Sequence, residues 1–145
     1  MERHEIFREL IRNLERKLGA LDEHQLSCCS ISLAQCHALV EIGRKKTVSL
    51  IQLSDILELE KSTVSRTVEH LVKAGLVKRD IDSSNRRYIT ITLSKGGEKL
   101  FNDIEKAMNL RFMHILQNIP KNKQDIVMDN LKTLINAIQS SELKS

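Results

Sequence analysis

The residues whose chemistry stands out form a short polar run near the middle of the chain. They are small hydroxyl side chains and two cations: Lys61, Ser62, Thr63, Ser65 and Arg66. Hydroxyl groups donate and accept hydrogen bonds, and Arg66 is long enough to reach a phosphate or the edge of a guanine. Val64, Val68 and Leu71 recur at the spacing of one helical face. The run therefore predicts a helix that packs through one face and contacts a ligand through the other.

Positive charge is concentrated in the same part of the chain. Residues 61–95 hold eight basic and three acidic residues, a net charge of +5, so the rest of the chain carries −1 of the total of +4. This is typical of a phosphate-binding surface, although a solvated basic face has the same composition. We expect Lys78 and Arg79 to contact phosphates. We expect Arg86 and Arg87, beside turn-forming residues, to enter the minor groove of duplex DNA, which attracts arginine.

A second cluster consists of thiols and an imidazole: Cys28, Cys29, Cys36 and His37 lie within ten residues. The cluster allows three interpretations. A thiol near a cation could act as a redox switch, and Cys and His together could bind Zn²⁺. Alternatively, Cys36 is a small core residue and His37 a hydrogen-bonded histidine on the buried stripe of its helix. In all three interpretations this cluster belongs to regulation or packing.

Enzyme motifs are absent from the sequence. It has no glycine-rich phosphate loop, no HExxH motif and no G-x-S-x-G motif. Cys36 and His37 are helix neighbours, whose side chains point about 100° apart, so they do not form a nucleophile and base pair. We therefore expect neither an enzyme nor a cofactor. The remaining alternative to DNA binding is a protein-interaction module of the same fold.

Hydrophobic spacing predicts the elements that position these groups. Amphipathic helices are expected at about 2–25, 32–45 and 50–57, with a short extended link at 47–49 before the third. The helix with the polar run should start near Ser62, whose hydroxyl can cap it. It should end at Gly75 in a left-handed conformation, with Leu76 folding back on Leu71.

A hairpin and two long helices follow. Strands are expected at 76–81 and 88–93, the second with Ile89, Ile91 and Leu93 facing the helices. Ser94 can cap a fifth helix, and Pro120 separates it from a sixth. With five Gly and one Pro in 145 residues, long helices should dominate. The fold class is thus mainly α with a small β-hairpin wing, a winged helix-turn-helix.

Four segments of the sequence resemble the MarR (multiple antibiotic resistance regulator) family: Leu53–Val68, Leu71–Arg79, Asn85–Arg87 and Ile91–Gly97. The resemblance covers almost the whole chain. It implies one domain over 1–145, with a DNA-binding lobe at about 32–95 and dimerisation helices at about 2–25 and 96–142. It also implies a sequence-specific transcription regulator that binds a pseudo-palindromic operator in double-stranded DNA as a homodimer. Such proteins are usually repressors released by a small-molecule effector, an oxidant or a metal.

The sequence departs from the family pattern at two points, Glu58 and Asn85. Glu58 stands where the family often has Gly, so the turn before the polar helix must form without one. Asn85 replaces an Asp that pairs with the Arg matching Arg87, and Asp82 is a substitute partner. Zinc-sensing relatives have a His aligned with His37, but their paired His on the fifth helix are matched here only by His114. A metal-responsive regulator is therefore the weaker alternative, and we predict no metal ligands.

The terminal helices also indicate a homodimer independently of the family. They carry wide apolar stripes beside a lobe that should be nearly complete without them, so a second copy is the economical partner, although packing within one chain is the alternative. The charged N-terminus, the odd number of Cys and the absence of a long apolar run predict a cytoplasmic protein with no membrane segment.

Overall fold

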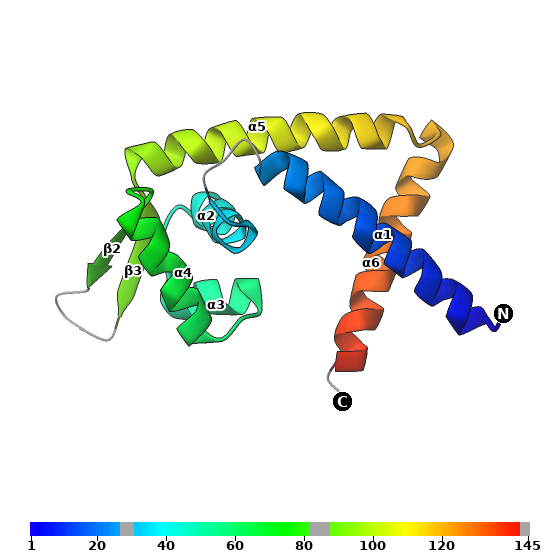
Figure 1. Ribbon diagram of the computed structural model, residues 1–145, viewed down its shortest axis with the longest axis horizontal. Coiled ribbons are helices and arrows are strands. Elements are labelled where there is room, and N and C mark those ends of the chain that lie inside the picture. Colours follow the sequence, from blue (N-terminus) through cyan, green and yellow to red (C-terminus); the bar gives the residue numbers. More distant parts are fainter. Residues whose placement is uncertain (27–30, 82–87, 143–145) are drawn as a thin grey trace. The chain divides into compact units, whose positions relative to one another are not determined.

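The computed structural model of the chain describes residues 1–26, 31–81 and 88–142 (Figure 1). They form two compact units, Met1–Glu105 and Lys106–Ser145. The elements in chain order are α1 (Arg3–Leu26), α2 (Leu33–Lys45), β1 (Val48–Ser49), α3 (Leu50–Leu57), α4 (Lys61–Lys73), β2 (Val77–Ile81), β3 (Ile89–Leu93), α5 (Lys95–Gln117) and α6 (Lys121–Glu142). The predicted order of helices and strands is confirmed.

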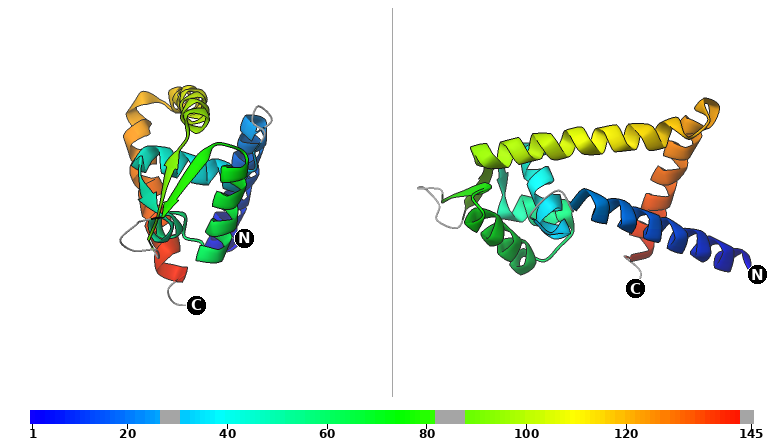
Figure 2. Two further views of the ribbon diagram at one scale, coloured as in Figure 1. Left: turned by 90° about the vertical axis from the view of Figure 1, so that its left-hand side faces the viewer. Right: turned by 45° about the horizontal axis from the view of Figure 1, so that its top comes forward.

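The strands form a three-stranded antiparallel sheet in the order β1-β3-β2. Val48 pairs with Ile91 on one side of β3, and Val77 pairs with Leu93 on the other. The sequence indicated that residues 47–49 are extended but did not predict that they pair with β3. The sequence predicted that Ile89, Ile91 and Leu93 of β3 face the helices. Ile91 is fully buried, whereas Ile89 and Leu93 are half-buried. Figure 2 shows β2 beside α4.

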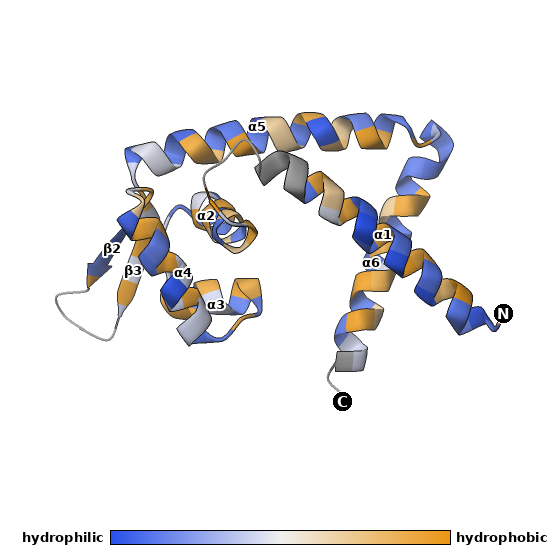
Figure 3. Ribbon diagram, viewed as in Figure 1, coloured by the Kyte–Doolittle hydropathy of each residue, from blue (hydrophilic) through white to orange (hydrophobic). Residues whose placement is uncertain are grey.

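The core of the first unit lies between α2, α3, α4 and the sheet. Its largest fully buried side chains are Leu39, Ile42, Leu53, Val64, Val68, Leu71 and Ile91. Each helix contributes buried apolar residues to this core, and Figure 3 shows hydrophobic and hydrophilic residues interleaved along α3 and α4. Burying an aliphatic side chain of this size stabilises the folded state by about 1.5–3 kcal/mol. The core therefore holds α4 through the same residues that the sequence assigned to packing.

Serine side chains cap α2 and α3. Ser32 Oγ accepts from the Gln35 amide at 3.2 Å, and Gln35 Oε1 accepts from the Ser32 amide at 3.3 Å. Ser49 and Gln52 repeat this reciprocal arrangement at 3.1 and 2.9 Å. Two capping boxes therefore satisfy backbone donors that each helix start would otherwise leave unpaired.

Two predictions about helix ends and faces are wrong. Ser62 does not cap α4, because α4 begins at Lys61 and Glu60 is the N-cap residue, without a side-chain cap bond. His37 does not lie on a buried stripe: it is exposed, because α2 packs through Cys36, Ala38, Leu39 and Ile42.

Candidate nucleic-acid interface

Helix α4 separates packing side chains from polar ones around its axis. Its fully buried residues are Val64, Val68 and Leu71. With 3.6 residues per turn, Ser62, Arg66 and Glu69 fall within about 60° of one another on the opposite side. We call this side the α4 polar face and define it by Ser62, Arg66, Glu69 and Lys73. It is the surface of α4 that a ligand can approach.

The five predicted contact residues of α4 differ in accessibility. Lys61, Ser62 and Arg66 are exposed, whereas Thr63 and Ser65 are half-buried. The structure thus brings these residues together at the N-terminal half of one helix, which is the part of a recognition helix that reaches base edges. Their contact with a base remains a prediction.

The turn before α4 forms without glycine. Glu58 adopts the left-handed conformation, with φ 55° and ψ 43°. The amide of Leu59 donates to the Ser54 carbonyl at 3.1 Å, which closes the end of α3. A left-handed conformation costs an L-residue about 1–2 kcal/mol. This turn places Lys61 at the start of α4, so the departure from the family pattern is accommodated by strain at one residue.

A glycine and a serine fix the other end of α4. Gly75 has φ 76°, its amide donates to the Val72 carbonyl, and the Leu76 amide donates to the Leu71 carbonyl, both at 3.0 Å. These two bonds are the predicted Schellman motif. Ser94 then accepts from the Gly97 amide at 3.1 Å, which confirms it as the cap of α5.

Ser94 also joins α5 to the end of α4. Its hydroxyl donates to the Gly75 carbonyl at 2.6 Å, and its amide donates to the Leu76 carbonyl at 3.0 Å. Gly97 lies so close to the Leu76 carbonyl that a Cβ there would collide with it. The end of α4, the beginning of β2 and the beginning of α5 therefore form one tight junction, which sets the direction in which the hairpin leaves α4.

Of the two cations on β2, one is paired with α4. Lys78 and Arg79 are both exposed, and Arg79 Nη1 donates to Glu69 Oε2 at 2.8 Å. Phosphate contact by either residue remains a prediction. Sequence reasoning missed Glu69, although its spacing of seven from Ser62 places it on the same helical side. The predicted wing-tip residues Arg86 and Arg87, with Asn85 and Asp82, lie outside the described residues.

Of the predicted cysteine and histidine cluster, the structure describes only Cys36 and His37. Cys36 is buried, whereas His37 next to it is exposed, so the two side chains leave α2 on different sides. Cys28 and Cys29 lie outside the described residues. Over residues 1–26, 31–81 and 88–142, no group of three or more His, Cys, Asp or Glu side chains could hold a metal ion. An effector or redox role for these four residues stays a prediction.

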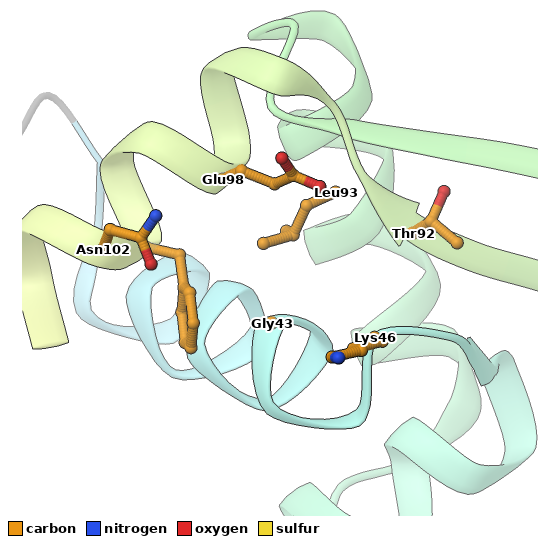
Figure 4. A pocket seen from close by; sticks show the side chains of 7 residues that line it. Gly43, Lys46, Thr92, Leu93, Glu98 and Asn102 are labelled. Atoms are coloured by element: carbon orange, nitrogen blue, oxygen red, sulfur yellow. The ribbon is translucent and has the colours of Figure 1, made fainter.

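A pocket of about 470 Å³ lies in the first unit (Figure 4), and neither Cys36 nor His37 lines it. The residues that line it come from the end of α2, from β3 and from α5: Gly43, Lys46, Thr92, Leu93, Glu98, Phe101 and Asn102. The Phe101 ring covers Gly43 so closely that a Cβ there would lie 2.5 Å from it. Lys46 has φ 67° and ψ −53°, and the Thr47 amide donates to the Lys45 carbonyl at 2.8 Å, which makes a strained γ-turn.

Comparisons with known proteins agree with this geometry. The model of the MarR family matches residues 31–89, the segment from the start of α2 to β3. A curated relative, the uncharacterized HTH-type transcriptional regulator YfiV of Bacillus subtilis (strain 168), is 20% identical over 112 residues, which are 77% of this chain and 70% of YfiV. Among the residues that the structure describes, every helix is too short or too polar to span a membrane.

Solved structures share the fold over nearly the whole chain. Streptococcus pneumoniae FabT in complex with DNA superposes with a TM-score of 0.86 at 18% identity, covering 94% of this chain and 98% of FabT. The S. aureus MepR–DNA complex gives a TM-score of 0.79 at 17% identity, covering 91% and 97% of the two chains. The match of the MarR family model to residues 31–89 and the shared fold over the length of the chain show that this chain is similar to MarR-family winged-helix regulators.

Proposed function

We propose that this protein is a sequence-specific regulator of transcription that binds double-stranded DNA as a homodimer. The observation that carries the proposal is the division of α4, whose buried stripe anchors it while Ser62 and Arg66 stay exposed on the other side. An α-helix fits the major groove, and residues near its N-terminus reach base edges there. FabT and MepR, which share the fold, were both solved with DNA bound.

Exposed apolar stripes support the homodimer. Along α1 they include Ile6, Phe7, Leu10, Leu14 and Leu18, and along α6 they include Met128, Leu131, Ile135 and Ile138. Each of these side chains is at least 39% exposed, which is unfavourable in water unless a partner covers it. A second copy would bring two lobes to one DNA duplex. Its operator would then be pseudo-palindromic, with half-sites about one helical turn, roughly 10 base pairs, apart.

The proposal includes repression that a small ligand or an oxidant relieves, in the cytoplasm where the DNA is. The pocket between α2, β3 and α5 supports a ligand because it combines the Phe101 ring with the polar groups of Lys46 and Asn102. The pocket is lined by α2, which packs against α4, and by β3, which belongs to the hairpin. A ligand bound there would therefore shift the positions of both α4 and the hairpin. For the oxidant, operator binding should change with diamide or peroxide and no longer change once Cys28, Cys29 and Cys36 are all replaced by Ser.

Selection of bound duplexes from a random DNA pool tests the central proposal. We expect enrichment of an inverted repeat, and binding that weakens steeply as salt rises because each phosphate contact releases counterions. If the protein enriches no DNA sequence and instead binds another protein with an affinity that does not depend on salt, the protein-interaction module is favoured. Adding Zn²⁺ or a chelator to the same assay tests the metal-responsive alternative, for which operator affinity must depend on the metal.

A further inference from the structure

Glu69 is an acidic residue on a surface that is otherwise suited to DNA. It belongs to the α4 polar face, in line with Ser62 and Arg66 and about 4.5 Å along the axis from Arg66. Its side chain is 43% exposed. A carboxylate in this position repels phosphates, so it weakens binding to DNA unless it meets a hydrogen-bond donor on the DNA.

Arg79 holds this carboxylate in place from the neighbouring strand. Its Nη1 donates to Glu69 Oε2 at 2.8 Å, across ten residues of sequence and between β2 and α4. The Arg79 side chain is itself 36% exposed, and an ion pair this accessible contributes little to the stability of the fold. The pair engages one acceptor atom of a group that has about four lone-pair sites, so Glu69 keeps the capacity to accept from a ligand.

We propose that Glu69 is a specificity-determining residue, which accepts a hydrogen bond from the exocyclic amino group of a cytosine in the major groove. This inference rests on the proposed DNA-binding function. Cytosine offers its N4 amino group in the major groove, and a carboxylate is the side-chain group that suits it. Arg79 is the positioning residue: it orients the carboxylate and offsets its charge. Where the DNA offers no amino group, the carboxylate is left against acceptors and phosphates, which penalises wrong sequences.

The test compares base preferences of the full-length protein and its variants after selection from a random duplex pool. We expect the wild type to enrich cytosine at one position of each half-site. In Glu69→Gln that preference should move to adenine, because an amide side chain pairs with the N6 and N7 edge of adenine. In Glu69→Ala, discrimination at the position should fall roughly tenfold, as for the loss of one specific base contact. Asp55→Asn, which removes an exposed carboxylate from α3, should keep the wild-type preferences.

Two further measurements separate reading of a base from a structural effect. In Glu69→Ala the released Arg79 can reach a phosphate, so the slope of log affinity against log salt on non-operator DNA should steepen by about one unit. Arg79→Ala should weaken operator binding, and Arg79→Lys should restore part of the loss. Thermal unfolding midpoints should stay at the wild-type value in all of these exposed variants.

Identical base preferences in the wild type, Glu69→Gln and Glu69→Ala would overturn the inference while leaving the proposed function intact. A loss of affinity that is equal for every sequence would overturn it as well, since it would assign Glu69 to folding or to general electrostatics. A wild type that enriches no sequence would instead refute the proposed function, and this inference with it.

Discussion

Helices α4 and α6 carry apolar residues at the same helical spacing, yet the structure treats them in opposite ways. Val64, Val68 and Leu71 of α4 have no exposed surface, whereas Leu131 and Ile135 of α6 are 44% and 53% exposed. The same spacing of apolar residues therefore serves two different functions in the two helices. In α4 it attaches a functional helix to its own lobe, and in α6 it leaves a surface that a second chain can cover.

Truncating the α4 stripe should have the largest effect on folding. Leu71→Ala removes a fully buried side chain from the core and should lower the free energy of unfolding by about 2–5 kcal/mol. Chemical denaturation, followed by circular dichroism at several protein concentrations, measures this loss. Leu131→Ala on α6 is the matched control: at a protein concentration low enough to keep the chain monomeric, it should cost under about 1 kcal/mol. Equal losses in the two variants would remove the distinction between the helices.

A charge in the α6 stripe should act on assembly instead. Ile135→Glu places a carboxylate in the proposed dimer interface, where an unpaired charge cannot be hydrated. We expect the dimer to weaken by about 3 kcal/mol, on the order of 100-fold in Kd, as measured by sedimentation velocity. Asn136→Glu adds the same charge on the polar side of α6 and should leave the dimer intact. A dimer that tolerates Ile135→Glu would mean that other residues form the interface.

The exposed side of α4 should matter for DNA and not for folding. Arg66→Ala should weaken operator binding by about 1–3 kcal/mol and relax the preference for one base if Arg66 contacts that base. Fluorescence anisotropy with the selected operator and with scrambled duplexes measures both effects. The unfolding free energy should stay close to that of the wild type. An equal loss on every duplex would assign Arg66 to a phosphate.

Local sequence predicted the C-terminal end and the buried face of α4, but not its N-cap, which is Glu60. The Schellman motif at Gly75 and the cap that Ser94 gives α5 each involve bonds within a few residues, so residue types at neighbouring positions were enough to predict them. His37 was misplaced because the buried side of α2 depends on which elements pack against it. The pair of Glu69 and Arg79 joins two elements across a junction, and nothing in either segment alone indicates it.

The smallest expected effect concerns the two left-handed residues that flank α4. Gly75 has φ 76° and Glu58 has φ 55°, but only the first is a glycine. Gly75→Ala should therefore destabilise the fold by about 1 kcal/mol. Glu58→Gly should stabilise it by about 0.5 kcal/mol, because relief of the strained conformation exceeds the entropy that glycine loses on folding. Thermal and chemical unfolding of the two variants measure both changes.

The opposite signs make this pair of substitutions informative about the turn before α4. If Glu58→Gly destabilises the protein instead, the side chain of Glu58 must contribute more than its backbone conformation costs. Glu58→Ala separates the two contributions, because alanine keeps the strain and removes the side chain beyond Cβ. A loss in both variants would assign a stabilising role to the carboxylate, whereas a gain in Glu58→Gly alone would leave backbone strain as the cost of building this turn without glycine.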